Sequence, residues 1–206
     1  MGTADGRRTA PTRFSTSGEQ MRPAGSIDMP RVSTLSGHCA TVGTGQEGTP
    51  LMGRTEYYYD PHAPKANSLI PASNLLVVDE RGAILLQRRR DTGQWALPGG
   101  AQDIGETAAQ CAVRECLEET GILAEITGFL GVYTNPRHIV AYSDGEIRQQ
   151  YETTYIGRPA SGQPTVNDEA DAVRFVSPGD LGENDIHPSM RQQIGDYLAG
   201  TYPPLS

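Results

Sequence analysis

The sequence predicts an α/β domain in which a mixed central sheet lies between helices, an α/β/α sandwich. Two observations favour this class. Short apolar runs of β-type residues recur between residues 73 and 176, and two helical segments interrupt or follow them. Strands interspersed with helices that pack on them are typical of such layered folds. We expect one domain over residues 51–206, because roughly 100–200 residues make a domain.

The first two predicted strands are the apolar runs 73–78 (SNLLVV) and 83–88 (AILLQR). The short polar stretch between them ends in Gly82, so a hairpin turn is expected there. A brief extended piece at 95–97 stops at Pro98-Gly99-Gly100. Clusters of Gly, Pro, Asn and Asp separate the later strands, which are predicted at 122–133, 147–157 and 172–176.

Two helices complete the predicted domain, at about 107–120 and 187–199. Gly121 suits the position just after the first helix, where the backbone turns left-handed. For the second helix, Ser189 and Asp185 are both plausible capping residues. At 100° per residue, one side of the first helix is apolar. Cys111 and Cys116 therefore read as small packing residues of that helix.

The first 50 residues differ in composition from the rest. Gly, Pro, Ser and Thr make up 25 of them, and the large apolar residues follow no period. Such a segment cannot bury enough surface to offset the entropy of ordering it. We expect residues 1–50 to be a disordered extension.

The charge balance excludes several functions. The chain has 17 Lys and Arg against 25 Asp and Glu, a formal net charge of −8. An acidic protein is a poor general binder of DNA, RNA or anionic membranes. No run approaches the ~18 apolar residues of a membrane helix. Three cysteines without metal-ligand spacing favour a reducing, cytoplasmic location.

Three glutamates of the first helix share one side. Glu115, Glu118 and Glu119 fall within an arc of about 100°, and at this spacing like charges repel. Solvent, Arg114 or a divalent cation could offset the repulsion, since Mg²⁺ prefers oxygen ligands. A solvated acidic helix face remains the alternative.

The surrounding segment carries a longer motif. Residues 100–122 fit G-x5-E-x7-R-E-U-x-E-E-x-G-U, where U is a bulky apolar residue and Cys116 is the loose match. This segment resembles the Nudix box, and the preceding GQWALPGG resembles the strand and turn that lead into it. The similarity extends over about residues 70–200, so the chain is similar to MutT-like Nudix hydrolases of bacteria.

The resemblance implies a pyrophosphohydrolase that uses Mg²⁺, or alternatively Mn²⁺, to cleave a diphosphate linkage. It implies that Arg114 orients the glutamates and that Glu106 holds the loop against the helix. It leaves open which glutamate acts as base, and Glu115 is our candidate. The implied metal ligands are the Gly100 carbonyl, Glu115, Glu118 and Glu119.

Outside the box, Nudix proteins often need one more carboxylate on a later loop. By resemblance this residue is Glu169, with Asp168 and Asp171 as competitors, and a merely solvated loop is the alternative. The loop is expected to be anchored at one end and mobile at the other. Arg89 matches an arginine that reaches substrate phosphate in similar proteins. The alternative is that Arg89 is simply a solvated basic residue at the end of a strand.

The substrate class stays broad. The resemblance implies a small nucleotide, as a nucleoside diphosphate derivative or a triphosphate. Trp95 is expected in the core, and Tyr133, His138 and Tyr155 either line a base pocket or simply pack. An enzyme for oxidised dGTP is an alternative, although no Asn aligns with the residue that reads the modified guanine.

Two alternatives come from other classes of function. One is a catalytically idle Nudix domain that senses a ligand, which the intact box argues against. The other is removal of the 5′-end pyrophosphate of RNA, which a net charge of −9 on residues 51–206 disfavours. We expect no long nucleic acid and no membrane as partners. A homodimer stays open.

Overall fold

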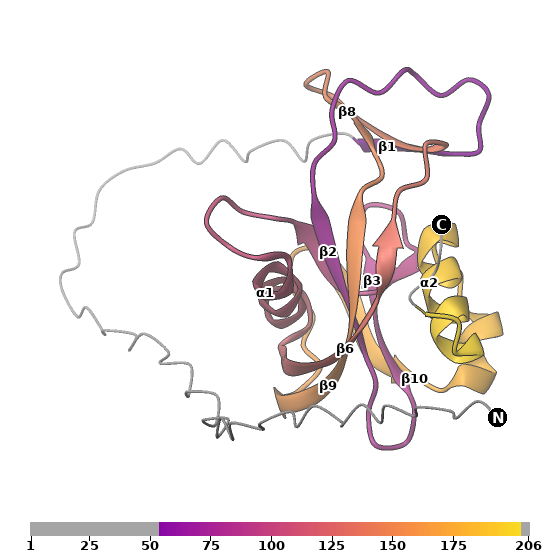
Figure 1. Ribbon diagram of the computed structural model, residues 1–206. Helices are drawn as coiled ribbons and strands as arrows, with labels where there is room; N and C mark the ends of the chain where they lie inside the picture. Colours follow the sequence, from indigo (N-terminus) through magenta and orange to yellow (C-terminus); the bar gives the residue numbers. More distant parts are fainter. Residues whose placement is uncertain (1–53, 203–206) are drawn as a thin grey trace, which may run out of the picture. The chain divides into compact units, whose positions relative to one another are not determined.

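Ten strands and two α-helices form the part of the chain that this computed structural model describes, residues 54–202 (Figure 1). The expected disordered extension, residues 1–50, lies outside the described residues. The helices are α1 (Ala108–Thr120) and α2 (Pro188–Ala199), and a 3-10 helix, η1, spans Pro178–Glu183. The strands are β1 (Arg54–Tyr58), β2 (Ala72–Val77), β3 (Ile84–Arg89), β4 (Trp95–Ala96), β5 (Gly99–Ala101), β6 (Ile122–Tyr133), β7 (His138–Tyr142), β8 (Ile147–Gln149), β9 (Glu152–Gly162) and β10 (Ala170–Val176).

The strands form three sheets. A four-stranded mixed sheet has the order β5-β2-β9-β6, in which β2 and β9 are parallel and the other pairs antiparallel. A second, antiparallel sheet has the order β10-β3-β4. The third, β1-β7-β8, is a small antiparallel sheet at one end of the molecule (Figure 1).

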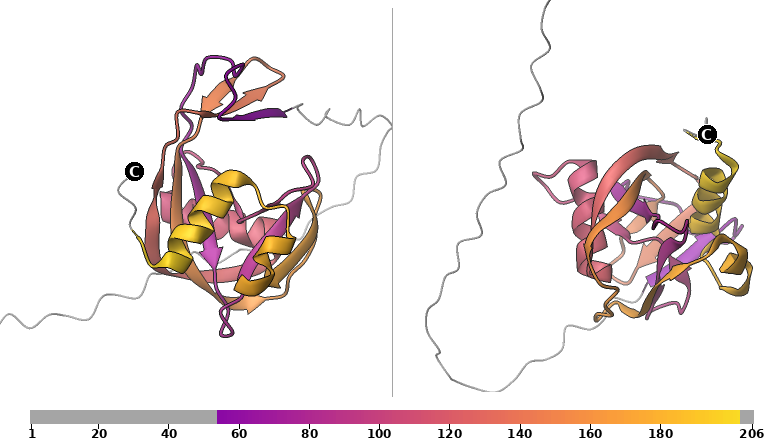
Figure 2. Two further views of the ribbon diagram at one scale, coloured as in Figure 1. Left: turned by 90° about the vertical axis from the view of Figure 1, so that its right-hand side faces the viewer. Right: turned by 90° about the horizontal axis from the view of Figure 1, so that it is seen from below.

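The core has two layers because β2 and β3 alternate their side chains. Leu75, Val77 and Leu85 pack with Ala112 and Cys116 of α1. The intervening residues of both strands face the opposite way and pack in a cluster that includes Ile194 of α2. Successive side chains of a strand point to opposite faces, so the two helices cover opposite sides of the strands (Figure 2). The predicted α/β/α sandwich with a mixed sheet is confirmed.

Local sequence explains where α1 begins and ends. The Thr107 side chain accepts a hydrogen bond from the backbone of Gln110, and the Gln110 side chain accepts one from the backbone of Thr107. This reciprocal capping box satisfies two backbone donors at the helix start. Gly121 ends the helix in the left-handed region, with φ of 73°, a conformation that costs glycine little. The predicted helix is confirmed.

Several predictions about the elements need correction. Asp79–Gly82 does form the expected turn, but β2 and β3 then diverge into different sheets, joined only by a bridge between Val78 and Ile84. The strand predicted at 147–157 is two strands, β8 and β9, in different sheets. The cap of α2 is His187, whose ring accepts a hydrogen bond from the Ser189 backbone, and not Ser189 or Asp185.

Candidate active site

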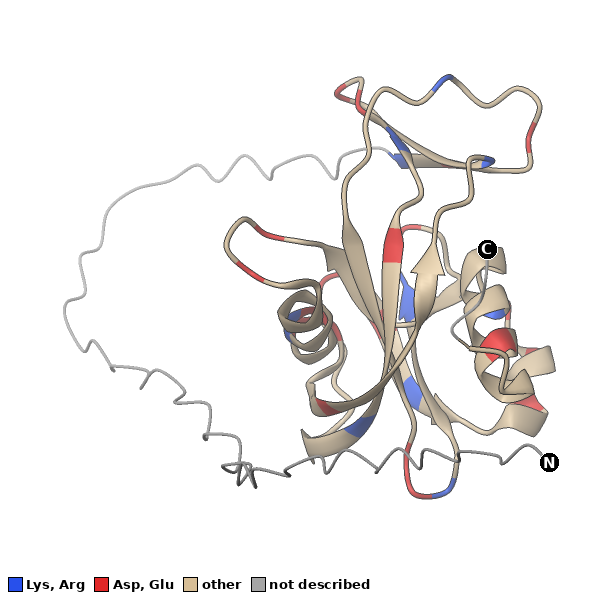
Figure 3. Cartoon of the chain, viewed as in Figure 1, with Lys and Arg blue, Asp and Glu red and all other residues tan. Residues whose placement is uncertain are grey.

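A cavity of about 340 Å³ contains most of the predicted site residues in its wall. The carboxyl side chains come from α1 and from the loop before β10, and the backbone comes from β5. Acidic residues also lie along the loop before α1, and basic residues lie on the β1-β7-β8 sheet (Figure 3). Among the cavity-lining residues are five that the sequence predicted: Arg89, Gly100, Glu115, Glu119 and Glu169.

Glu119 is the most buried of the three glutamates on α1, at 4% exposure. Its Oε2 accepts hydrogen bonds from the Gln87 side chain at 2.5 Å and from the Gly99 backbone at 2.7 Å. Burial raises the pKa of Glu119 to about 8, and the charge of Glu115 adds to the increase, against the lowering effect of the Gly99 hydrogen bond. A carboxyl group with this pKa has no full counter-charge in the metal-free protein.

Arg114 binds the glutamates around it. Its guanidinium donates to Glu106 at 2.6 and 3.0 Å, to Glu115 at 2.8 Å and to Glu118 at 3.0 Å. These contacts lower the pKa of Glu106 to about 2. Glu106 also accepts a hydrogen bond from the Asp103 backbone within the loop, so its carboxylate connects the loop to Arg114 of α1. The structure therefore brings Arg114 and Glu106 into the arrangement expected for orienting residues.

Glu115 lies against the backbone of β5. An added Cβ on Gly100 would come within 2.5 Å of the Glu115 carboxylate, so a larger residue would displace it. Burial raises the pKa of Glu115, and this effect exceeds the opposing influence of Arg114. Glu118 differs, because its side chain is 59% exposed and is absent from the cavity wall.

The loop before β10 is tied to the end of α1. The Asn167 side chain donates to the Glu118 carbonyl at 2.9 Å, and the Thr165 backbone donates to the Thr120 carbonyl at 2.8 Å. Asn167 also accepts from the backbone of Glu169 at 2.9 Å. The segment therefore has contacts at both ends, whereas the sequence predicted one anchored and one mobile end. Glu169 lines the same cavity as Glu115 and Glu119.

The competitors of Glu169 lie elsewhere. Asp171 pairs with Arg88 at 2.6 Å, and Asp168 is exposed. Neither is among the cavity-lining residues. Of these three acidic residues, only Glu169 lines the cavity, and its role as an additional ligand or base stays a prediction.

Arg89 lines the cavity, and its guanidinium already forms an ion pair with a neighbouring carboxylate. It binds Asp91 through two hydrogen bonds, at 2.8 and 2.9 Å. Burial lowers the pKa of Arg89, but Asp91 together with the charges of Glu119 and Glu169 outweighs burial and raises it. The side chain is thus a fixed cation next to the carboxylates.

The sequence missed a second group of cavity residues. Arg54, Glu56 and Arg148 come from β1 and β8, and His187 caps α2. Neither β1 nor β7 was predicted. His138 does line the cavity, whereas Tyr133 is buried and bonds Asp196. Tyr155 packs edge-on against Phe129, and Trp95 is core, as predicted.

Comparison with known proteins adds the family. Residues 69–197 match the family described as NUDIX domain. The chain belongs to the Nudix family. A Bacillus subtilis (strain 168) protein, provisionally named 8-oxo-dGTP diphosphatase, is 35% identical over 127 residues, which are 61% of this chain and 78% of that protein. A MutT-like protein of Streptomyces ambofaciens is 36% identical over 109 residues, 52% of this chain and 64% of that protein.

Solved structures show the same Nudix fold. A NUDIX hydrolase from Nitrosomonas europaea superposes with a TM-score of 0.55 at 22% identity, covering 67% of this chain and 94% of that one. A MutT NUDIX hydrolase from Burkholderia pseudomallei gives 0.52 at 25% identity, covering 63% and 98%. The expected Nudix and MutT-like resemblance is therefore confirmed.

The donor set fits a hard divalent cation of the kind that Nudix proteins generally use. Glu115, Glu119 and Glu169 offer only carboxylate oxygens, the ligands that Mg²⁺ prefers. Burial, with a further contribution from the charges of neighbouring carboxylates, raises the pKa of Glu115 and of Glu119. A bound cation would favour the ionised form of both groups.

Proposed function

We propose that this Nudix protein is a Mg²⁺-dependent pyrophosphohydrolase that cleaves the diphosphate linkage of a nucleoside diphosphate derivative or a nucleoside triphosphate. One observation carries the proposal: Glu119 is buried in the cavity wall with a pKa raised to about 8, beside Glu115 and Glu169. Burying a carboxylate without a counter-charge is costly, and a cation binding there would offset that cost.

In this proposal one group of cavity residues holds the metal and another group contacts the substrate. Glu115, Glu119 and Glu169, together with the Gly100 carbonyl and the exposed Glu118, would hold the cation. Arg114, which donates hydrogen bonds to Glu115 and Glu118, would position both carboxylates. Arg89 lies where it can contact a phosphate, with Arg54 and Arg148 also in the wall. When bound, the metal neutralises phosphate charge and makes water more acidic.

Glu169 and Glu115 are our candidates for the proton acceptor. A general base must reach the attacking water while it remains unprotonated. Glu169 lies on a loop segment beside the carboxylates, and Glu115 lies on α1 with Arg114 bonded to it. We assign Glu115 as base or ligand and Glu169 as the additional carboxylate, in keeping with their positions in the cavity wall.

A panel of candidate substrates tests the proposal. Nucleoside triphosphates, 8-oxo-dGTP and ADP-ribose would be incubated with and without Mg²⁺, and nucleotide and phosphate products measured. We expect Mg²⁺-dependent cleavage of at least one class and loss of turnover in Glu119→Gln. Glu125→Gln is the matched control, because Glu125 is exposed and pairs with Arg158 at the surface. Absence of turnover in the natively folded protein would instead favour the idle ligand-sensing alternative.

Oxidised dGTP is the second candidate substrate, supported by the relative from Bacillus subtilis that carries the corresponding name. Asn184 does not supply the side-chain amide that would recognise the modified guanine. Its side chain already accepts a hydrogen bond from Arg174 at 2.6 Å and donates one to the Asp180 carbonyl at 2.7 Å. Asn74 lines the cavity, but its side-chain amide is likewise occupied, donating to Glu152 at 3.1 Å and to Gln193 at 3.3 Å. The ratio of kcat/KM for 8-oxo-dGTP over dGTP decides between this activity and a broader one.

The predicted partners remain small molecules. No helix within residues 54–202 has the length and apolar character needed to span a membrane. A steep salt dependence of RNA binding would contradict the exclusion of long nucleic acids. A cytoplasmic location and a homodimer stay predictions.

A further inference from the structure

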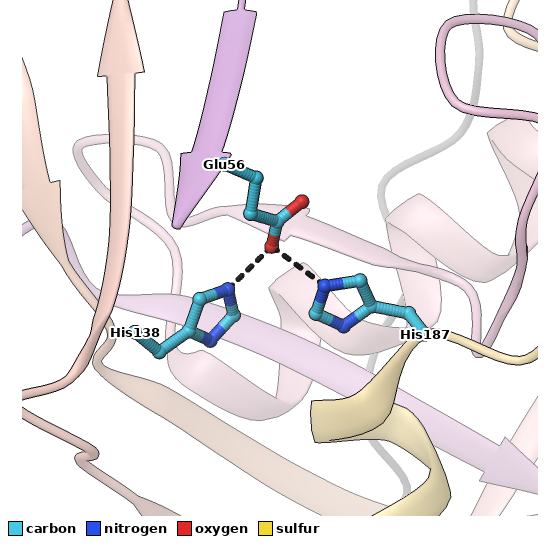
Figure 4. Close-up of side chains that lie close together, drawn as sticks. All are labelled: Glu56, His138 and His187. Carbon is cyan, nitrogen blue, oxygen red and sulfur yellow. Dashed lines mark hydrogen bonds and ion pairs between the residues drawn. The ribbon is translucent and has the colours of Figure 1, made fainter. Parts of the chain in front are cut away.

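Two histidines and a glutamate converge in the wall of the same cavity (Figure 4). Glu56 extends from β1, His138 is the first residue of β7, and His187 caps α2. The Glu56 Oε1 lies 2.9 Å from the His187 Nε2 and is also bonded by the His138 Nε2. The three candidate ligand atoms all lie within 4.8 Å of one another.

The side chains of this Glu56-His138-His187 cluster are largely removed from solvent. Their exposed fractions are 14%, 4% and 11%. The two imidazoles are stacked with centroids 5.2 Å apart, and the Tyr58 ring packs edge-on against both. Three polar groups from distant parts of the chain are thus held together, with the Nε2 atoms of both histidines directed at the Glu56 Oε1.

The outer nitrogens of the rings are compatible with ligation through Nε2. Metal-binding histidines generally donate their other N–H to a nearby acceptor. The His187 Nδ1 accepts a hydrogen bond from the Ser189 backbone and lies 2.8 Å from the Ser189 hydroxyl. Ligation through Nε2 would move the ring proton to Nδ1, where the hydroxyl can accept it. The His138 Nδ1 is buried without a hydrogen-bond partner among residues 54–202. Ligation through Nε2 would therefore place the His138 ring proton on a nitrogen that has no acceptor in this part of the chain.

The ligand chemistry selects the kind of metal. Two imidazole nitrogens and one carboxylate form a donor set typical of Zn²⁺ and related transition metals, whereas Mg²⁺ prefers oxygen alone. Bonds of about 2.0–2.1 Å place the donor atoms of a tetrahedral site roughly 3.3 Å apart. The 2.9 Å separation of the His187 Nε2 from the Glu56 Oε1 would open by a few tenths of an ångström, and the shorter contact between the His138 Nε2 and the same oxygen would have to open further.

We propose that Glu56, His138 and His187 form a transition-metal site of the Zn²⁺ class, separate from the carboxylate site on α1. An ion there would join β1, β7 and the start of α2, which are three segments far apart in the sequence. Because all three ligands line the cavity, the remaining coordination position would be reached from the side where substrate binds. The proposal concerns metal binding alone and stands whether or not the proposed hydrolysis is correct.

The first test uses the full-length protein stripped of metal and then saturated with Mg²⁺, which occupies the oxygen ligands. We expect one Zn²⁺ per chain to bind in calorimetry. We expect the imidazole ¹⁵N resonances of His138 and His187 to shift on binding, while that of the exposed His62 does not. Co²⁺ should give visible absorption bands of a four- or five-coordinate site. At a hundredfold excess over Kd, the melting temperature should rise by about 5–10 °C.

Substitutions locate the site. His138→Ala and His187→Ala should each weaken Zn²⁺ binding at least ~10-fold, the smallest loss that even outer contacts of a metal site produce. His62→Ala is the matched control and should bind as wild type does. Glu119→Gln should lose Mg²⁺ affinity and keep Zn²⁺ affinity. If the wild type binds no Zn²⁺ in the presence of Mg²⁺, or its His138 and His187 resonances stay unchanged on Zn²⁺ addition, the cluster is only a hydrogen-bonded contact.

Discussion

Replacing Glu119 by Gln should stabilise the metal-free protein in a pH-dependent way. The buried carboxyl has a pKa of about 8 against an ordinary value of 4.5. Between these values the folded state holds a proton that the unfolded state has lost, so stability falls as pH rises. At about 1.4 kcal/mol per pH unit, the full effect is roughly 5 kcal/mol above pH 8. Gln avoids this cost, because its carbonyl oxygen can still accept from Gln87 and Gly99.

Urea unfolding in the presence of EDTA measures the effect. At about pH 9 we expect Glu119→Gln to be more stable than wild type by at least ~2 kcal/mol, and at about pH 5 by less than ~1 kcal/mol. Glu118→Gln is the control, since its exposed carboxylate should give no such trend. Saturating Mg²⁺ should stabilise wild type and leave the variant unchanged. A stability difference independent of pH would refute the assignment of Glu119 as an uncompensated buried carboxyl.

Three further predictions concern catalysis. Glu118→Gln should leave the circular dichroism native, because the residue is exposed, yet lower Mg²⁺-dependent turnover at least ~10-fold; unchanged turnover would remove Glu118 from the ligands. Gly100→Ala should displace the Glu115 carboxylate, lowering turnover and costing about 1–3 kcal/mol of stability, whereas Gly195→Ala, with open space around it, should slightly stabilise α2. Glu169→Gln should reduce kcat more than Mg²⁺ affinity and shift the acid limb of the pH–rate profile; a larger loss in Asp171→Asn would move the role to Asp171.

Local signals were enough to predict α1 and its surroundings. The Thr107 cap, the apolar face and Gly121 all lie within one short segment, so their consequences can be worked out from neighbours in the sequence. The same holds for the long strand β6 that follows. The Nudix resemblance implied that Arg114 orients the glutamates and that Glu106 holds the loop against the helix, and in the structure these two side chains are hydrogen-bonded to each other.

Elements whose identity depends on distant partners were harder to predict. The run at 147–157 reads as one strand, but it divides because Ile147 to Gln149 pair with β7, whereas the residues from Glu152 pair with β2 and β6. The small sheet with β1 was missed for the same reason. As a result, the cluster of Glu56, His138 and His187 could not be assembled from spacing, since its members are brought together only by β1, β7 and α2.

Within the site, too, the environments of the three glutamates on α1 depend on distant partners and could not be predicted from the helical pattern. A helical projection places Glu115, Glu118 and Glu119 on one arc and makes them equivalent. In the structure, however, Glu118 is 59% exposed and Glu119 is 4% exposed. The difference arises because the Gly99 backbone and the Gln87 side chain cover Glu119. Burial by these tertiary neighbours, which no helical pattern shows, raises the pKa of Glu119 even though the Gly99 hydrogen bond lowers it, and a cation bound in the cavity would offset the cost of ionising this carboxyl group.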